Sequence, residues 1–451
     1  MILTPASLGL WNTVSKKVFR AEYRRPDEHE LKGKILGTLE EREVAAYIHI
    51  PYCTGTCWFC PYVRYPIPRD RVEVLVGKYV GFLKKEISMY GELLRSKGLK
   101  VIDVHAGGGT PSLVPAKYWR EVLEELSSSF EAEPVIAIEA NPEDLKDEGR
   151  AYELVEAGVR EFSLGVQSFH PELLSRLGRR HGVEDSIKAY ENLRGAGAKY
   201  VNIDLMYMIP GQTLQQWVSD LDKAASLGPD EITAYPTLVL ESSVGYKMIR
   251  EGRLPEQPGM ELFRRMVYAA EDLLTRRGYL GLEIYGYSKH PDWKYVTVNY
   301  EMEGPLLGFG VGAMGFTGYY EYQNTCYPET YADLLLRGKL PVAFARDVSL
   351  EERAVRYTTC RLFICRLLDK KDFEAKFKQP FNELLGRTGF RLFLRILKLR
   401  GDVVEREDRL ALTRKGLFTA HKVTWAFVMN VPCRMVEECL REPLPNHVII
   451  P

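Results

Sequence analysis

The chain has 451 residues, with 61 basic and 61 acidic side chains and 45% hydrophobic residues. This length allows two or three domains with a full core, and the composition is that of a globular protein. A net charge of zero excludes a protein-wide electrostatic attraction to nucleic acid or to an anionic membrane. Eight cysteines are too few for a disulfide scaffold, and the first residues lack a secretory signal pattern. We therefore expect a cytoplasmic protein in a reducing setting, without membrane association.

Residues 1–43 are polar and irregular, and we expect them to form an N-terminal extension that packs little against the rest. From residue 44, short β-branched runs alternate with amphipathic helical stretches. The six runs are 44–50, 101–105, 135–140, 161–166, 200–205 and 231–235. Such alternation predicts a parallel sheet with crossover helices. Six units are two fewer than a closed barrel needs, so residues 44–285 are predicted to form an α/β fold, a partial (β/α)6 TIM-like barrel.

The pattern changes after residue 285. Residues 286–345 are rich in glycine and tyrosine and are predicted to be a connecting segment. Residues 346–451 are predicted to form a small helical domain resembling a winged helix, because a short strand and turn at 409–416 precede an aromatic helix. This region has 21 basic and 14 acidic side chains, a local net charge of +7 against −7 in the rest. The charges are interspersed, so we expect a lid or substrate-docking domain and no binding of nucleic acid.

Three cysteines directly follow the first predicted strand, as Cys53-x3-Cys57-x2-Cys60. Three neighbouring thiolates suit a soft metal centre, and with a 4Fe-4S cluster they would leave one iron open to an external ligand. A structural zinc site is the alternative, and it would need a fourth ligand such as His49 or His105.

This spacing resembles the signature of radical S-adenosylmethionine (SAM) enzymes. The wider run Tyr-Ile-His-Ile-Pro-Tyr-Cys, residues 47–53, resembles the subgroup of oxygen-independent coproporphyrinogen III oxidases. That subgroup includes haem chaperones, anaerobic haem-degrading enzymes and two-SAM methyltransferases. The resemblance spans roughly residues 44–430 and continues in order through the motifs at 107–111 (GGGTP), 139–142 (EANP), 165–169 (GVQSF), 177–181 (LGRRH) and 204–213 (DLMYMIPGQT).

The resemblance implies which residues hold the cofactors. The cluster would be held by Cys53, Cys57 and Cys60. The residues that would contact SAM are Gly107, Gly108, Gly109, Thr110, Glu139, Gln167, Arg179 and Asp204. The motifs follow the carboxyl ends of predicted strands, where the active sites of α/β barrels lie, so one pocket could receive all of these side chains.

The resemblance also implies a role for each of these residues. The three glycines would let the backbone approach the methionyl end of SAM, with Thr110 in the same turn. Arg179 would pair with the SAM carboxylate, and Gln167 and Asp204 would hold the ribose hydroxyls. The candidate catalytic residues are Tyr47, packed against the cluster or the sulfonium, and Glu139, beside the amino or ribose groups.

The implied chemistry is reductive cleavage of SAM to a 5′-deoxyadenosyl radical, which abstracts hydrogen from an organic substrate. The expected substrate is a tetrapyrrole or another conjugated compound, and the expected electron donor is a protein such as flavodoxin or ferredoxin. Two departures keep alternatives open. Oxidases of the subgroup carry a further cysteine two residues after the third, whereas this sequence has Pro61 and Tyr62 after Cys60. The haem-chaperone pattern has a histidine directly before an asparagine, whereas no histidine precedes Asn299 in this sequence. A two-SAM methyltransferase, with a second SAM molecule, and a haem carrier without turnover therefore remain as hypotheses.

Several other signals are given structural interpretations. Gly310, Gly312 and Gly315 match a dinucleotide fingerprint, but a strand-like run follows them, so we expect tight turns that line the pocket. Five cysteines are expected to lie outside the cluster, namely Cys326, Cys360, Cys365, Cys433 and Cys439. His170 is expected at the surface, and Met206 and residues 235–245 on the substrate side of the pocket.

Overall fold

The structure is a computed structural model that describes residues 8–18, 20–132, 136–241, 243–291 and 304–450. Asn299, on which the comparison with the haem-chaperone pattern depends, lies outside the described residues. Within the described ranges, no helix combines the length and the apolar character that a membrane crossing requires.

Six parallel strands form the part of the sheet that was predicted as a partial barrel. They are β2 (Glu43–Ile50), β5 (Lys100–Gly108), β7 (Ile136–Ala140), β8 (Val159–Gln167), β9 (Tyr200–Tyr207) and β10 (Glu231–Pro236), and they lie side by side in the order β10-β9-β8-β7-β5-β2. The prediction of a partial (β/α)6 barrel is confirmed. These strands are almost wholly buried because helices cover their outer face.

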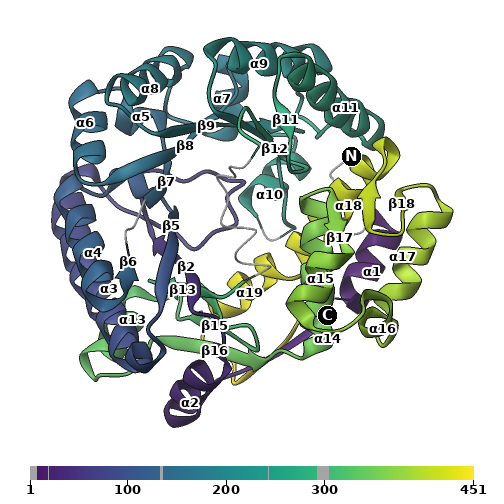
Figure 1. Cartoon of the computed structure of the whole chain (residues 1–451). Coiled ribbons are helices and arrows are strands. Elements are labelled where there is room, and N and C mark those ends of the chain that lie inside the picture. Colours follow the sequence, from purple (N-terminus) through teal and green to yellow (C-terminus); the bar gives the residue numbers. More distant parts are fainter. Residues whose placement is uncertain (1–7, 19, 133–135, 242, 292–303, 451) are drawn as a thin grey trace.

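The crossover helices form an arc outside the strands (Figure 1). They include α3 (Val72–Leu94), α4 (Ala116–Ser129), α6 (Glu148–Glu156), α8 (Val183–Gly195), α9 (Leu214–Leu227) and α11 (Met260–Arg276). In α3, the side chains of Val76, Tyr79, Leu83, Ile87 and Tyr90 are buried, which is the face that the three- and four-residue spacing predicts.

Residues 304–345 continue the sheet instead of connecting two domains, which corrects the sequence-based expectation. β13 (Leu306–Phe309) pairs in parallel with β2, and β14 (Met314–Phe316), β15 (Tyr320–Asn324) and β16 (Val342–Asp347) follow as antiparallel neighbours. A tight turn joins β13 to β14 at Gly310 and Gly312, both with positive φ, and no helix begins there. The expectation of a turn in place of a dinucleotide-binding loop is thus confirmed.

The N-terminal segment is ordered and packed, so the prediction of a loosely packed extension is wrong for residues 8–43. α1 (Leu10–Val18), β1 (Ala21–Arg24) and α2 (Glu28–Thr38) contribute to the core, and β1 pairs with β16 and with β20 (His447–Ile450). The Tyr23 hydroxyl donates to Glu321 Oε2 at 2.8 Å, across 298 positions of sequence. Partners this distant leave no local pattern in the sequence.

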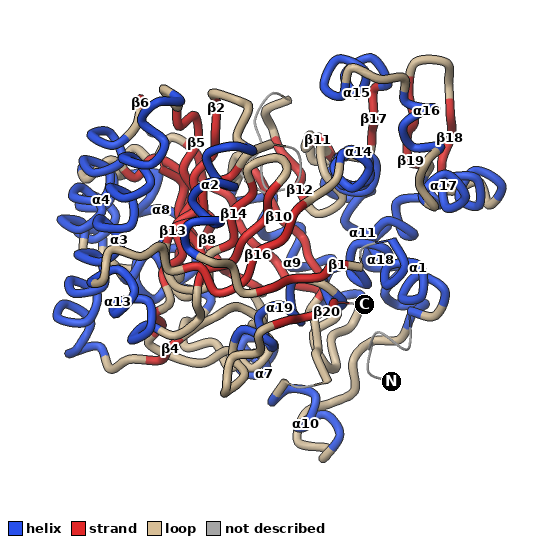
Figure 2. Tube along the Cα trace, turned by 90° about the horizontal axis from the view of Figure 1, so that it is seen from below, coloured by secondary structure: helices blue, strands red, loops and turns tan. Residues whose placement is uncertain are grey.

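The C-terminal region contains the predicted helix and wing. β19 (Arg409–Leu412) pairs with β17 (Leu367–Asp369) and β18 (Val403–Glu405), and α18 (Arg414–Asn430) follows directly. Figure 2 shows β17–β19 to one side of the barrel, while α18 and α19 (Pro432–Cys439) return toward it. A disulfide between Cys326 and Cys439 joins the end of α19 to the segment after β15, a pairing that the sequence did not suggest.

Candidate active site

A cavity of about 850 Å³ lies between the carboxyl ends of the parallel strands and helices α18 and α19. Of the twelve residues predicted for the site, eleven line it: Tyr47, Cys53, Cys57, Cys60, Gly108, Gly109, Thr110, Glu139, Gln167, Arg179 and Asp204. Gly107 is not part of the lining. The sequence-based expectation that strand-end motifs meet in one pocket is therefore met by all but one of the predicted residues.

The three cysteines lie on a loop that folds back over the end of β2. Cys53 belongs to the short strand β3 (Tyr52–Cys53), and the Arg64 guanidinium fixes the rest of the loop by donating to the carbonyl oxygens of Cys60 at 2.6 Å and Cys57 at 2.9 Å. Thr110 Oγ1 donates to Cys53 Sγ at 3.4 Å. Burial raises the pKa of the Cys53 thiol, and it raises that of Cys60 to about 11. A bound cationic metal centre would favour the thiolate forms of these groups.

The three glycines of the GGGTP motif leave room for other parts of the site. A Cβ atom at Gly108, whose φ is +102°, would lie 2.4 Å from the Cε1 atom of His49, and one at Gly109 would lie 2.6 Å from the Tyr52 carbonyl oxygen. At Gly107 a Cβ atom would lie 2.8 Å from Glu139 Oε1. Gly107 thus makes space for Glu139 and is not part of the cavity lining, and its role in the backbone approach to SAM stays a prediction.

Arg179 connects the cysteine loop to the strands. Its Nη1 atom donates to Cys57 Sγ at 3.5 Å, and its Nη2 atom donates to Asn141 Oδ1 at 2.7 Å and to the Gly165 carbonyl oxygen at 3.0 Å. The Nε atom of Arg179 is buried and has no hydrogen-bond partner within the described part of the chain. A positive side chain with a donor atom to spare suits an anionic ligand in the cavity.

Two polar side chains on neighbouring strands lie deeper in the cavity. Gln167 ends β8 with a φ of +70°, unusual for a residue other than glycine, and its Oε1 atom accepts from Tyr235 Oη at 2.8 Å. Asp204 on β9 accepts from Ser163 Oγ at 2.6 Å and from Asn202 Nδ2 at 2.9 Å. Burial raises the pKa of Asp204 to about 7, with a smaller contribution from the negative charge of Glu139. Backbone strain of this kind and a shifted carboxyl pKa are frequent at functional sites.

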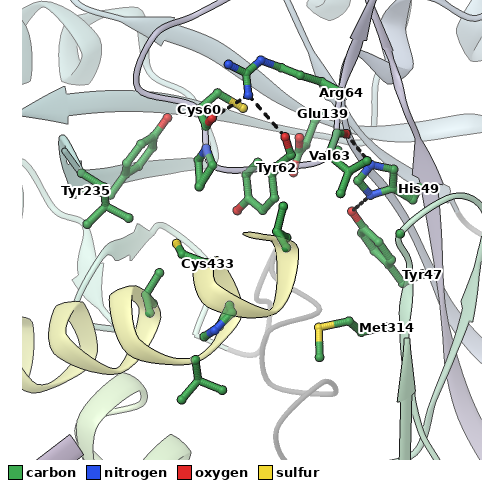
Figure 3. A pocket seen from close by; sticks show the side chains of 18 of the residues that line it. Tyr47, His49, Cys60, Tyr62, Val63, Arg64, Glu139, Tyr235, Met314 and Cys433 are labelled. Atoms are coloured by element: carbon green, nitrogen blue, oxygen red, sulfur yellow. Dashed lines mark hydrogen bonds between the residues drawn. The ribbon is translucent and has the colours of Figure 1, made fainter. Parts of the chain in front are cut away.

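Tyr47 and two histidines form the floor of the cavity beside β2 and β5. The Tyr47 ring stacks on His105 with ring centroids 6.0 Å apart, and its hydroxyl lies 3.1 Å from His49 Nδ1. His49 Nε2 lies 2.8 Å from the Val63 carbonyl oxygen, so Nε2 carries the proton and Nδ1 accepts from Tyr47. Burial lowers the pKa of His49, which keeps the ring neutral. Figure 3 shows this chain of hydrogen bonds from Tyr47 through His49 to Val63.

Within the described ranges, no group of three or more histidine, cysteine, aspartate or glutamate side chains is placed to hold one metal ion, which disfavours the zinc alternative. The cysteine ligands of a 4Fe-4S cluster bind different irons, so this finding does not test the cluster. His49 has both ring nitrogens occupied by Tyr47 and Val63, and the Nε2 atom of His105 lies 3.6 Å from Glu139 Oε1.

The sequence also predicts that Met206 and residues 235–245 lie on the substrate side, and that His170 lies at the surface. Met206 and, from residues 235–245, Tyr235, Pro236 and Leu238 line the cavity, while their place on the substrate side stays a prediction. His170 does not line it, and its side chain is one-quarter exposed and lies 3.8 Å from Asp220.

Sequence reasoning expected a lid or substrate-docking domain at the C-terminus but identified none of the side chains that form the opposite wall of the cavity. Its residues come from strands β14–β16 and helices α14 (Leu350–Thr359), α18 and α19, and they include Met314, Gln323, Arg346, Trp425 and Cys433. Figure 3 shows Cys433 directed from its helix toward the loop with Cys60 and Tyr62. Burial raises the pKa of the Cys433 thiol to about 12. No motif in the sequence links these residues to the cysteine loop, because they lie more than 250 positions away from it.

Comparisons with known proteins agree with this geometry. The model of the radical SAM superfamily matches residues 47–224. Heme chaperone HemW of Escherichia coli (strain K12) is 31% identical over 274 residues, which are 60% of this chain and 70% of HemW. Oxygen-independent coproporphyrinogen III oxidase of Bradyrhizobium diazoefficiens is 27% identical over 403 residues, 84% of this chain and 86% of the oxidase. The solved structure of coproporphyrinogen III oxidase (HemN) from Escherichia coli has a TM-score of 0.76 at 22% identity, and it covers 90% of this chain and 94% of its own.

The fold and the cysteine loop are those of a radical SAM protein. The chain belongs to the radical SAM superfamily, and within it to the subgroup of HemW and the oxygen-independent coproporphyrinogen III oxidases. Its cofactors are accordingly a 4Fe-4S cluster and SAM. The donor set fits both, since three thiols share one loop and the buried Arg179 Nε atom is available beside them.

Proposed function

We propose that the protein is a radical SAM enzyme that acts on a tetrapyrrole-type substrate, in the manner of a coproporphyrinogen III oxidase. One observation carries the proposal. The three cysteines and the residues proposed to bind SAM line one side of a cavity whose other side belongs to the C-terminal helices. A volume of about 850 Å³ is near the upper end for small-molecule pockets, so the cavity has room for an organic substrate beside SAM.

Cys53, Cys57 and Cys60 would hold the cluster, and Arg179, through its unpartnered Nε atom, would bind the SAM carboxylate. When bound and reduced by a donor such as flavodoxin or ferredoxin, a cluster held by these cysteines would supply the electron for reductive cleavage of SAM, the chemistry that would allow hydrogen to be taken from the substrate. The protein would orient SAM and the substrate relative to each other and exclude water from the cavity.

Four further residues would complete the binding of SAM. Gln167 and Asp204 would hold the ribose hydroxyls, because their polar atoms face the cavity from adjacent strands. Tyr47 and Glu139, both in the lining, would contact the sulfonium end and the amino group. The strained backbone of Gln167 supports its role, because strain of this kind persists where a side chain must point in a particular direction.

A haem carrier is the second candidate, because HemW of Escherichia coli, to which the chain is 31% identical, is named a heme chaperone. A carrier would bind haem in the same cavity without consuming SAM. A two-SAM methyltransferase is the third, and it would place a second SAM molecule in the space described here for substrate.

One anaerobic experiment separates the candidates. The cluster is reconstituted, and SAM and a reductant are added with coproporphyrinogen III or with haem. 5′-Deoxyadenosine formed together with a decarboxylated or otherwise altered tetrapyrrole supports the proposal. S-adenosylhomocysteine beside 5′-deoxyadenosine favours the methyltransferase. Stoichiometric haem binding without SAM cleavage favours the carrier.

The cluster assignment has its own control. Cys57→Ala should lose iron and SAM cleavage together, whereas Cys365→Ser should retain both, since Cys365 lies outside the predicted cluster loop and does not line the cavity. Unchanged iron content in Cys57→Ala would refute the assignment of the metal-binding loop.

A further inference from the structure

Two buried polar side chains in the wall opposite the cysteine loop have no partner. Gln323 on β15 is fully buried, and neither its Oε1 nor its Nε2 atom has a hydrogen-bond partner within the described part of the chain. Trp425 on α18 is 1% exposed, and its Nε1 atom likewise has none there. Both side chains line the cavity. Buried polar groups are nearly always hydrogen-bonded in folded proteins, so two such exceptions in one wall need a cause.

Two residues of the same types, Gln212 and Trp217, are equally buried elsewhere in this protein and have hydrogen-bond partners. Gln212 is equally buried, and its amide accepts from the Ile209 backbone N–H at 3.3 Å and donates to the Met206 carbonyl oxygen at 3.4 Å. The fully buried Trp217 donates through Nε1 to the Met266 carbonyl oxygen at 2.9 Å. Burial of glutamine or tryptophan thus need not leave polar atoms unpaired in this fold, although Gln379 Oε1, which is outside the cavity lining, also has no partner among the described residues.

The strands beside Gln323 offer no partner for its side chain among the described residues. Its cross-strand neighbours are Met314 and Phe344, which offer no side-chain oxygen or nitrogen. Glu321 lies on the same face of the strand, two residues away, but Arg346, Arg356 and Tyr23 occupy its carboxylate. The charges nearby are already paired, and only the amide of Gln323 remains available.

The rest of this wall is mainly apolar. The side chains that line it from strand β14 and the C-terminal helices include Met314, Phe316, Val355, Phe427, Val431 and Val436. An apolar wall with a few hydrogen-bonding groups suits a ring compound that carries isolated polar substituents. Among the unpaired atoms, Gln323 Nε2 and Trp425 Nε1 are N–H donors, which match carbonyl or carboxylate oxygens of a ligand, and Gln323 Oε1 is an acceptor, which matches an N–H or O–H group.

We propose that the wall between β15 and α18 binds the ring system of the substrate, and that Gln323 and Trp425 donate hydrogen bonds to its carbonyl or carboxylate oxygens. This inference rests on the proposed function and specifies the substrate's place in the cavity, on the side opposite the cysteines. It explains the two orphaned groups as specificity-determining residues that are satisfied only when substrate is bound.

The test compares two pairs of variants for stability. Gln323→Leu and Trp425→Phe remove polar atoms that have no partner, whereas Gln212→Leu and Trp217→Phe remove polar atoms that have one. In the reconstituted protein without substrate, we expect the first pair to keep or raise the melting temperature, and the matched second pair to lower it. A loss of stability in Gln323→Leu as large as in Gln212→Leu would overturn the inference, since Gln323 would then have a structural partner.

Ligand binding supplies the second measurement. Coproporphyrin III and haem are titrated by absorbance into the wild-type holoenzyme and into the first pair of variants, with iron content as the check on folding. We expect each variant to bind roughly tenfold more weakly, since loss of one hydrogen bond to an oxygen of the ligand has about that effect. Equal affinity in wild type and variants would reject the inference and leave the proposed function standing. A wild-type protein that binds neither compound would instead reject the tetrapyrrole class and this inference with it.

Discussion

The guanidinium of Arg179 lies against the sulfur of Cys57, with Nη1 3.5 Å from Sγ. The same side chain donates through Nη2 to Asn141 at 2.7 Å and to the Gly165 carbonyl oxygen at 3.0 Å. Arg179 therefore couples the loop proposed to hold the cluster to the strands proposed to hold SAM. Through these contacts, the LGRRH motif that contains Arg179 meets the cysteine loop, the EANP motif and the GVQSF motif in one region of the cavity.

Replacement of Arg179 by lysine should separate these two tasks. Lysine keeps the positive charge but lacks the planar fork of donors, so it cannot contact Asn141, Cys57 and a SAM carboxylate together. We expect iron content to stay near wild type and SAM affinity to fall roughly tenfold or more, as measured by anaerobic equilibrium dialysis. Arg180→Lys is the matched control, because Arg180 is exposed and, among the described residues, donates to the Thr54 carbonyl oxygen alone, at 2.6 Å. Equal losses in both variants would argue against a special role for Arg179.

Gly108→Ala should damage the site through sterics alone. The new Cβ atom would lie 2.4 Å from the His49 ring, at a backbone φ of +102° that L-residues rarely adopt. Strain and overpacking together should cost about 2–4 kcal/mol of unfolding free energy, measured by urea denaturation. Gly81→Ala in α3 should instead be neutral or stabilise by up to about 1 kcal/mol, since nothing lies within 4 Å of the new atom. If the two variants had similar unfolding free energies, the turn at Gly107–Gly109 would be able to accommodate a side chain without a loss of stability.

The strand-end half of the site could be predicted from the sequence residue by residue. The side chains of the opposite wall could not. The six parallel strands follow from a local pattern of β-branched runs, and motifs at their carboxyl ends are brought together by any parallel barrel. Gln323, Trp425 and Cys433 have no such signature, because they reach the cavity only through packing between segments that are distant in sequence. The same holds for β1, whose Tyr23 finds Glu321 across 298 positions. Gly107 is different again. Its motif was recognised from the sequence, but the space that it leaves for Glu139 depends on where that side chain lies in the fold.

SAM affinity should depend on pH through Asp204. Burial raises the pKa of this carboxyl to about 7, so it takes up a proton as the pH falls from 8 to 6. A carboxylate accepts hydrogen bonds more strongly than a neutral carboxyl, so SAM should bind roughly fivefold more weakly at pH 6 than at pH 8. Asp204→Asn should bind weakly at both values, with little pH dependence. If equilibrium dialysis showed the same change of SAM affinity with pH in the variant as in the wild type, a group other than Asp204 would be responsible.

Glu86 should make the folded state less stable as the pH rises. This fully buried carboxyl accepts from the Gly310 backbone N–H at 2.7 Å, from Tyr331 Oη at 2.6 Å and from Asn324 Nδ2 at 2.7 Å, which fixes the turn after β13. Burial raises its pKa from 4.5 to about 7 despite these donors. Between pH 4.5 and 7 the folded state therefore holds a proton that the unfolded chain has lost, so the stability contributed by Glu86 falls across this window, by about 3 kcal/mol at most.

Glu86→Gln isolates this effect, because other buried carboxyls titrate equally in wild type and variant. The unfolding free energy of the variant minus that of the wild type should rise by up to about 3 kcal/mol between pH 5 and 8, measured by urea denaturation. Glu321→Gln is the control with the opposite shift. Although burial raises the pKa of Glu321, the charges of Arg346 and Arg356 bring it down to about 2, so its stabilisation is lost only below pH 4.5. Its difference from the wild type should be constant over pH 5–8, and a flat Glu86→Gln difference over that range would mean that Glu86 is ionised in the fold.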